Sequence, residues 1–215
     1  MTQNREHGEQ AEAVSFVHMA DGTREDYELL DRLEHKFNEG LPDRLLAALE
    51  RLKDSLSGYQ VSRYEHSLQA ASRAYRNGEN EEMIVAALVH DIGDELAPYT
   101  HGEMVAAIFK PYMSAKTCWI VKHHGLFQTY YYAHFFGGDP NARDRFKEHP
   151  WYQDCIDFCD QYDQNCFDPN YESLPLSFFA PMVRRIFSQP PDVDDDRSWQ
   201  TGEEAVTQET ANSNA

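Results

Sequence analysis

Histidine and aspartate side chains that could bind metal ions gather in the middle of the sequence. Seven of the ten histidines lie between His66 and His149. In the run VAALVHDIGD, His90 and Asp91 directly follow an apolar stretch that should be buried. A buried carboxylate without a partner costs several kcal/mol, so this pair requires a cation or a full set of hydrogen bonds. Imidazole and carboxylate suit hard and borderline divalent metals, whereas the cysteine-rich ligand spacing of structural zinc sites is missing.

Further candidate ligands stand on the expected helices on either side of this pair: His66, His101, His124 and Asp163. Side chains near helix ends can converge on a metal without disturbing the packed middle of a helix. His123 competes with its neighbour, but Ile120, one turn before His124, places His124 on the apolar face. Asp160 lies one turn before Asp163 and could accept a hydrogen bond near the site or lie on a solvated face. The pattern predicts a metal site built from separate helices.

These residues resemble the signature of the HD-domain superfamily, H…HD…D on a helical bundle. The segment EHSLQAA places its histidine 24 residues before that of HDIGD. The histidines in THGEMVAAI and IVKHHG extend the likeness to the binuclear branch, H…HD…H…H…D. Within that branch, the E-H-S-L-Q run and the Q-Y-D-Q surround of Asp163 look most like the mixed-valent diiron oxygenases. That group includes myo-inositol oxygenase and the bacterial oxygenase that cleaves hydroxylated aminoethylphosphonate.

The likeness covers about residues 58–168, and what it implies is a pair of iron ions, Fe(II) and Fe(III). One iron would be bound by His66, His90, Asp91 and Asp163. The second would be bound by His101 and His124, with Asp91 bridging the two. The resemblance also implies that Asp91, His101 and His124 act in catalysis on a small-molecule substrate and O2. Manganese, magnesium or zinc are the alternative metals.

Three functional interpretations remain open at this point. A diiron oxygenase would oxidise or cleave a small hydroxylated substrate, with phosphonates as one candidate class. A binuclear phosphohydrolase would use its metals to activate water and polarise a phosphoryl oxygen. The body through LPLSFFAPMVRRIF also looks similar to bacterial proteins labelled predicted HD phosphohydrolases. The third interpretation is a catalytically idle HD scaffold, against which the complete ligand set argues. Asp94 stands where many nucleotide-directed HD hydrolases have lysine, and a carboxylate repels phosphate, which favours the oxygenase.

The sequence indicates the residues that contact the substrate less clearly than it indicates the metal ligands. The phosphonate-cleaving oxygenases place a lysine one turn after the fourth histidine, and Gln128 stands at that position here. Their Tyr–Glu lid is not matched at its spacing, so Tyr27 or Tyr59 could serve in its place or pack in the core. The remaining candidates for contact with the substrate are Gln69, Arg63, Lys122, Arg184 and Arg185.

Helix start and stop signals recur along the whole chain, and they predict an all-α fold, an HD-domain helical bundle. Leu29, Leu30, Leu33 and Phe37 mark one face of a helix that should end near Gly40. An S-x-x-E capping box at Ser62 opens the helix that carries His66, and Asn80 can cap the next one. A second capping box is expected from Thr100 and Glu103. Ser114 should begin a helix that Gly125 stops. No hairpin turn joins two alternating runs.

Length and composition set the wider limits. The 215 residues suit one domain, with 19–190 as the body and the ends, 1–18 and 191–215, expected to be disordered. The formal charge of −18 argues against a nucleic-acid partner, because phosphate binding needs clustered lysine and arginine. No run of 18 apolar residues and no secretory signal is present, and the four cysteines (Cys118, Cys155, Cys159 and Cys166) show no disulfide framework. We therefore expect a cytoplasmic protein without a membrane span, and the sequence does not indicate its oligomeric state.

Overall fold

The computed structural model describes residues 12–193, and within that range the chain forms helices and no strand. The predicted all-α fold is confirmed. Most of the two segments expected to be disordered, residues 1–11 and 194–215, lies outside the described residues.

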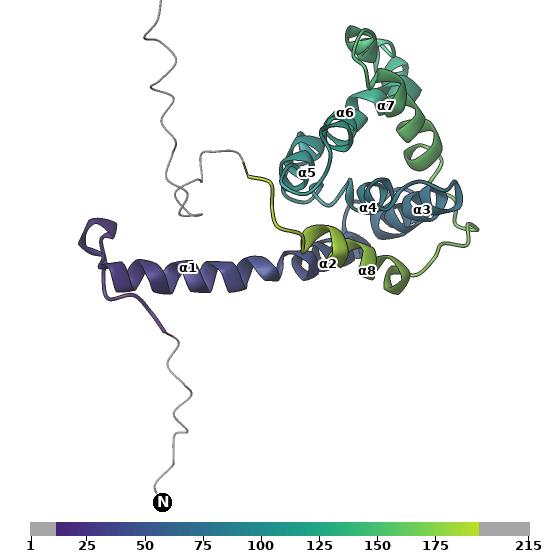
Figure 1. The fold of residues 1–215 in the computed structure, drawn as a ribbon. Coiled ribbons are helices and arrows are strands. Elements are labelled where there is room, and N and C mark those ends of the chain that lie inside the picture. The colour runs from purple at the N-terminus through teal and green to yellow at the C-terminus, as the bar shows by residue number, and fades with distance from the viewer. Residues whose placement is uncertain (1–11, 194–215) are drawn as a thin grey trace, which may run out of the picture.

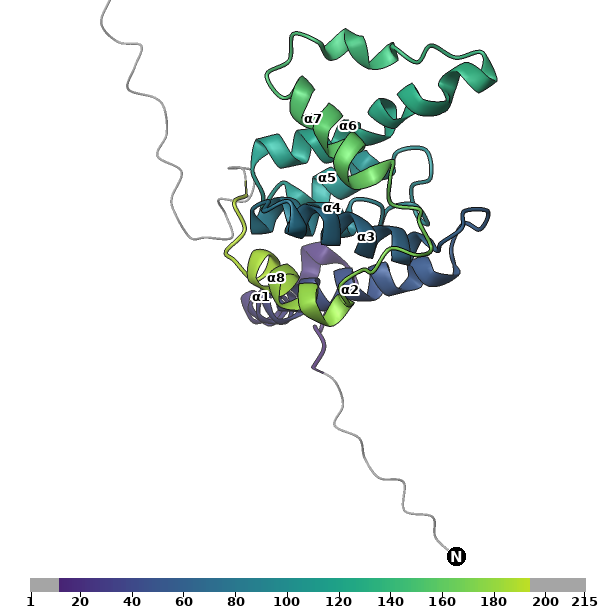
Figure 2. The same ribbon diagram turned by 90° about the vertical axis from the view of Figure 1, so that its right-hand side faces the viewer.

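The centre of the fold is a pair of packed helices, α3 (Arg63–Arg76) and α4 (Glu81–Val89). Helix α4 is apolar on every side, with all residues from Ile84 to Val89 buried, so it must be covered all round. It packs against α3, α6 (Ala115–Tyr132) and α8 (Leu176–Phe187). Figures 1 and 2 show this central pair between a lower and an upper group of helices.

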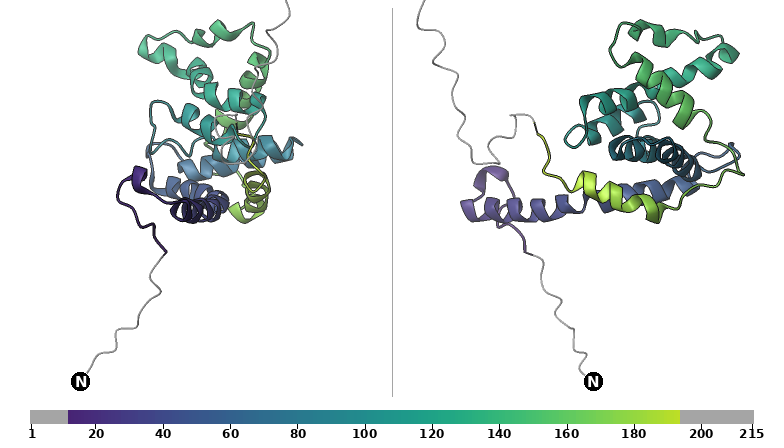
Figure 3. Two further views of the ribbon diagram at one scale, coloured as in Figure 1. Left: turned by 60° about the vertical axis from the view of Figure 1, so that its left-hand side comes forward. Right: turned by 45° about the vertical axis from the view of Figure 1, so that its right-hand side comes forward.

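The lower group consists of α2 (Leu41–Arg51) and α8, which lie side by side, with the short turn η2 (Leu52–Asp54) after α2. Helix α1 (Arg24–Glu39) precedes α2 and projects away from the body (Figures 1 and 3). It follows the short helix η1 (Met19–Asp21) and ends at Gly40, as predicted. Its apolar residues are largely exposed, with Phe37 at 63%. Among the described residues, the Arg44 guanidinium lies over the Phe37 ring at 3.9 Å, but most of this face remains exposed.

The upper group consists of α5 (His101–Phe109), α6 and α7 (Tyr152–Phe158), in which α6 packs against both of the others. Two short 3-10 helices, η3 (Ala133–Phe136) and η4 (Ala142–Phe146), connect α6 to α7. After Phe158 the backbone widens into a π-helical turn, η5 (Cys159–Asp163), which packs against α3. Within residues 12–193, no helix combines the length and apolar character needed to cross a membrane.

Three predicted helix starts are confirmed. Ser62 and Glu65 form the capping box of α3, with Ser62 N donating to Glu65 Oε2 at 2.8 Å. Asn80 caps α4, and Ser114 caps α6 by accepting a hydrogen bond from a backbone N–H. These caps fix where α3 and α4 begin and therefore set the register that carries His66 and His90 inward.

Two local predictions are wrong. Thr100 makes no side-chain capping bond, because its backbone (φ −143°, ψ 28°) departs from the extended cap geometry, and Glu103 lies 3.7 Å from Lys122 instead. Gly125 does not stop α6, which continues to Tyr132. The cost of a glycine inside a helix is only about 1 kcal/mol, which tertiary packing overrides. A Cβ built on Gly125 would make only ordinary contact with the His101 ring, at 3.6 Å, whereas one on Gly102 of α5 would lie 2.6 Å from the Val121 carbonyl oxygen of α6. Gly102 is therefore the glycine that allows α5 and α6 to approach closely.

Candidate metal centre

The structure brings the six candidate ligands together from five places in the chain. His66 lies in the first turn of α3, His90 caps the C-terminal end of α4, and Asp91 follows it directly. His101 is the first residue of α5, His124 lies within α6, and Asp163 ends the π-helical turn η5. All are buried except His101, whose side chain is 22% exposed. Five of the six lie at or near helix ends, as the sequence predicts, whereas His124 lies in the middle of α6 because that helix does not stop at Gly125.

Two histidine pairs face each other across this cluster. In the inner pair, the Nε2 atoms of His66 and His90 are 3.3 Å apart. In the outer pair, the Nε2 atoms of His101 and His124 are 3.1 Å apart. Two nitrogens bound at right angles to one ion, each at about 2.1 Å, would be separated by roughly 3.0 Å. Both pairs therefore have the spacing that a shared metal ion requires.

Asp91 lies between the pairs and offers one oxygen to each. Its Oδ2 is 3.3 Å from His66 Nε2 and 3.1 Å from His90 Nε2. Its Oδ1 is 3.5 Å from His101 Nε2 and 3.4 Å from His124 Nε2. A carboxylate divided in this way can bridge two ions. Asp163 completes the inner side, with Oδ1 3.4 Å from His66 Nε2.

The far side of each imidazole explains why the Nε2 atoms point inward. The Nδ1 atoms of His66, His90 and His124 lie 3.2, 2.9 and 2.6 Å from the carbonyl oxygens of Cys166, Ala87 and Val121, respectively. A carbonyl can only accept, so each of these Nδ1 atoms carries a proton, and Nε2 is the ring atom left to bind a metal ion on the side of the cluster. Facing lone pairs at such short distances need a cation between them.

The pKa values of the two carboxyl groups in the cluster indicate that the cluster is negatively charged and can bind cations. Burial alone would raise the pKa of Asp91, but His90 and Arg63 outweigh it and hold that pKa well below its usual range. Burial also opposes ionisation of Asp163, yet the hydrogen bond and charge of His90 lower its pKa to about 2. Both carboxylates are therefore anionic. In the absence of a metal they raise the pKa of His90 against the effect of burial, so a proton and a metal compete for the same place.

Within residues 12–193, three groups of His, Cys, Asp or Glu side chains could each hold a metal ion, with ligand atoms within 4.8 Å of one another. These groups are His66, His90 and Asp163; His90, Asp91 and His124; and Asp91, Asp94 and His101. All six sequence-derived candidates occur in them. The donor set therefore fits divalent metals, and the assignment of each residue to a particular ion stays a prediction.

His123 and the other histidines considered near the site have aromatic partners outside the cluster. The His123 ring packs 4.7 Å from the Trp119 ring and 4.6 Å from the Phe146 ring, while His124 turns inward. His149 stacks on Trp119 at 4.0 Å. Asp160 accepts a hydrogen bond from Tyr131 on the exposed side of η5. The structure thus brings His124 into the cluster and not His123.

Several candidate substrate contacts are placed away from the cluster. Tyr27 donates to the Met19 carbonyl on the projecting helix α1. Arg184 pairs with Asp43 at 2.8 Å on the lower group of helices. Arg185 pairs with Glu81, at the opposite end of α4 from His90, and nine helical residues span about 13 Å. These three side chains are therefore not brought together with the candidate ligands.

Other candidate contacts lie nearer the cluster. Tyr59 stacks on Phe167, which in turn stacks on His66, each at 4.5 Å between ring centroids. Gln69 is buried and uses both ends of its amide on the backbone of Asp168, so it holds the segment after η5. Gln128 lies half-buried on α6, one turn after His124. Phe167, which covers His66, was not indicated by any sequence pattern.

Arg63 has a different role from the anion contact considered from the sequence. Its Nη2 donates to Asp91 Oδ2 at 2.6 Å and to Asp94 Oδ2 at 2.7 Å. The charges of both carboxylates raise the pKa of Arg63 despite its burial. The guanidinium is therefore occupied by the chain's own carboxylates and is not free to bind a substrate anion.

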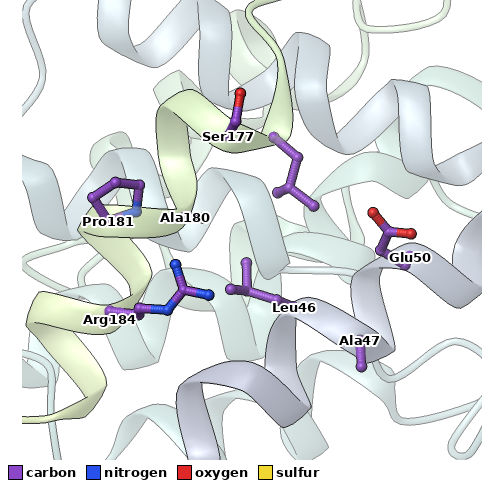
Figure 4. Close-up of a pocket in the computed structure, with 8 residues that line it drawn as sticks. Leu46, Ala47, Glu50, Ser177, Ala180, Pro181 and Arg184 are labelled. Carbon is purple, nitrogen blue, oxygen red and sulfur yellow. The ribbon is translucent and has the colours of Figure 1, made fainter.

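A pocket of about 430 Å³ opens beside the outer pair. Its lining includes His101, Lys122, His123, Tyr132 and Arg145. A second pocket of about 660 Å³ lies between α2 and α8, where Leu46, Glu50 and Arg184 line it (Figure 4). No member of the cluster lines this second pocket. Of these two pockets, the one beside His101 is therefore the one that offers a substrate access to the cluster.

Helical architecture combined with a histidine–aspartate cluster is typical of a metal-dependent enzyme. A family model described as HD domain matches residues 63–161, a little under half of the chain. Residues 63–161 are thus similar to the HD domain, which belongs to a superfamily of metal-dependent hydrolases. The match contains five of the six candidate ligands and ends two residues before Asp163. No curated protein matches the chain.

Proposed function

We propose that this protein is a non-haem diiron oxygenase that uses O2 to oxidise or cleave a small hydroxylated substrate. The observation that carries the proposal is the position of Asp91, which offers one oxygen to each histidine pair. Each metal position then has two imidazoles and at least one carboxylate. Two histidines and one carboxylate with open positions are the ligand set of non-haem Fe(II) oxygenases.

The surroundings of the cluster support redox chemistry on a small molecule. Bound irons would supply the electrons and the open coordination positions that O2 and a substrate hydroxyl require. The chain contributes geometry: the Nδ1 hydrogen bonds hold the rings, and Asp91 fixes the separation of the two positions. Phe167 stacks on His66, Tyr59 stacks on Phe167, and the two inner histidines are fully buried.

Substrate would enter at the outer pair, since His101 is the one partly exposed candidate ligand and lines the adjacent pocket. Lys122 also lines this pocket and lies 3.7 Å from Glu103, so its ammonium group could orient a polar or anionic group of the substrate. Asp94, 18% exposed and next to His101, disfavours a phosphoryl group at the same place.

The test begins with the metal itself. Protein reconstituted anaerobically with Fe(II) should bind two irons per chain and give a mixed-valent EPR signal after partial oxidation. The His149→Ala variant is a matched control, because this histidine stacks on Trp119 outside the cluster. One tightly held zinc with no affinity for iron would contradict the proposal.

A binuclear phosphohydrolase is the second candidate, because HD domains form a hydrolase superfamily. The two activities separate in a direct assay on panels of small hydroxylated compounds and phosphate esters. Substrate-dependent oxygen consumption supports the oxygenase. Phosphate release with Mn²⁺ or Mg²⁺, unchanged when oxygen is removed, supports the hydrolase.

A further inference from the structure

His101 differs from the other three histidines in the partner of its Nδ1 atom. The other three Nδ1 atoms meet backbone carbonyls. His101 Nδ1 lies 3.3 Å from Oδ1 of Asp94, a carboxylate. A carboxylate behind a metal-binding imidazole fixes its tautomer and orientation and makes the opposite nitrogen a stronger donor. Asp94 is therefore a candidate for the residue that orients the His101 ring.

Asp94 is itself held in place from its other side. Its Oδ2 accepts from Arg63 Nε at 3.0 Å and from Arg63 Nη2 at 2.7 Å, a two-pronged contact of fixed geometry. The same guanidinium donates to Asp91 Oδ2 at 2.6 Å. One arginine thus ties the carboxylate behind His101 to the carboxylate between the two histidine pairs.

The backbone of the HDIGD turn makes this contact possible. Asp94 N donates to the Asp91 carbonyl at 3.0 Å, which closes the turn. A Cβ built on Gly93 would lie 3.0 Å from the His101 carbonyl oxygen and 3.1 Å from its Cα. These contacts are tighter than most that a Cβ makes, so a side chain at this position would force the turn and the first residue of α5 apart by a few tenths of an ångström.

Asp94 could instead be a direct ligand, since it forms one of the candidate groups with Asp91 and His101. The geometry argues otherwise. His101 turns Nε2 toward His124 and Asp91, at 3.1 and 3.5 Å, and Nδ1 toward Asp94. The two ring nitrogens point to opposite sides, so an ion held by the outer pair cannot also reach the Asp94 oxygen at Nδ1.

We infer that Asp94, held by Arg63, is a positioning residue that orients His101 and thereby sets the metal affinity of the outer pair alone. The inference rests on the proposed two-metal site. Asp94 contacts neither inner histidine in the described contacts, so its loss should leave the inner position intact. Removing such a partner typically weakens metal binding by about 10–100-fold.

The experiment is equilibrium dialysis of the full chain against graded Fe(II) under anaerobic conditions, with bound iron measured by elemental analysis. Wild-type protein should bind two ions. The Asp94→Ala variant should bind one ion with unchanged affinity and the second about 10–100-fold more weakly. Glu95→Gln is the matched control, since it removes a negative charge one residue further on, where Glu95 pairs with Arg51. It should behave as wild type.

Asp94→Asn separates the positioning role from direct ligation and is close enough in shape to preserve folding. An amide oxygen can still accept from His101 Nδ1 but is a poor metal ligand, so positioning predicts a smaller loss than in Asp94→Ala. Equal losses in the two variants would overturn the inference in favour of a ligand. Undiminished binding in Asp94→Ala, or equal weakening of both ions, would overturn it as well. A wild-type protein that binds fewer than two ions would instead refute the two-metal site on which the inference rests.

Discussion

The inner and outer histidine pairs use the same ligand chemistry in different surroundings. His66 and His90 are fully buried and are held by backbone carbonyls, and the ring of Phe167 stacks on His66. His101 is partly exposed, begins a helix, depends on a side-chain carboxylate and lines a pocket of about 430 Å³. The difference suggests a division of labour, in which the inner position retains its ion and the outer position admits substrate.

The largest effect should come from removing the residue that both pairs share. Asp91→Ala takes one oxygen from each metal position and leaves Arg63 without a main partner. We expect loss of both ions, measured as iron per chain after reconstitution. His149→Ala should retain wild-type metal content. One ion retained at full occupancy in Asp91→Ala would show that the two positions are independent of this bridge.

The second prediction compares one ligand from each pair. His124→Ala should remove the outer ion and leave the inner one, because His66, His90 and Asp163 still surround it. The loss should exceed the roughly 10–100-fold expected for a residue that only orients a ligand. His66→Ala should remove the inner ion and also lower the melting temperature, since a fully buried side chain is lost. Metal analysis and thermal unfolding measure the contrast, and identical stoichiometry in the two variants would contradict it.

A third, intermediate effect is expected at Gly93. The added methyl group of Gly93→Ala would press on the backbone of His101, 3.0–3.1 Å away, and displace the outer pair. We expect weaker binding of the second ion and unchanged binding of the first, read from the same dialysis. If the ion at the inner pair were lost instead of the ion at the outer pair, the turn at Gly93 would be shown to support the inner pair.

The smallest effect on the cluster should come from a carboxylate outside it. Asp26, at the start of α1, accepts hydrogen bonds from Ser15 and Thr23, which lower its pKa to about 2. Because the folded pKa lies below the ordinary value of 3.8, its contribution is present above about pH 4 and is lost as the pH falls toward 2.

Amide hydrogen exchange in the first turn of α1 should therefore quicken over that pH window. The Asp26→Asn variant should show fast exchange already at neutral pH and normal binding of both metal ions. A change in the metal content of Asp26→Asn would mean that α1 and the cluster are coupled, which the contacts of α1 do not indicate.

Residue type and local pattern were sufficient to predict the helices and to select residues that do converge. His90 and Asp91 stand out because an apolar helix ends in two ionisable groups. Burying such groups without a cation or hydrogen-bonding partner would be too costly, so the sequence predicts that a partner is present. The role of Asp94 could not be predicted in this way. Its contact with His101 depends on how closely the HDIGD turn meets α5, and that distance is set by tertiary packing at Gly93.

The errors have a related physical origin. The local propensity of Gly125 predicts a helix stop, yet α6 continues through it to Tyr132, because tertiary packing outweighs the small cost of one glycine inside a helix. The sequence alone suggests that Arg63 is a free cation that could bind a substrate anion. In the structure it pairs with two carboxylates, Asp91 and Asp94, which lie 28 and 31 residues away in sequence. Long-range contacts decided these positions, and spacing along one sequence does not encode them directly.

The central claim is that Asp91 bridges two ions, one at each histidine pair. The most direct measurement is anomalous X-ray scattering at the iron edge from crystals of the iron-loaded protein. We expect two iron peaks, each next to a different carboxylate oxygen of Asp91 and separated by roughly 3.5–4 Å, as in other two-metal sites. A single peak, or peaks that Asp91 does not contact, would contradict it.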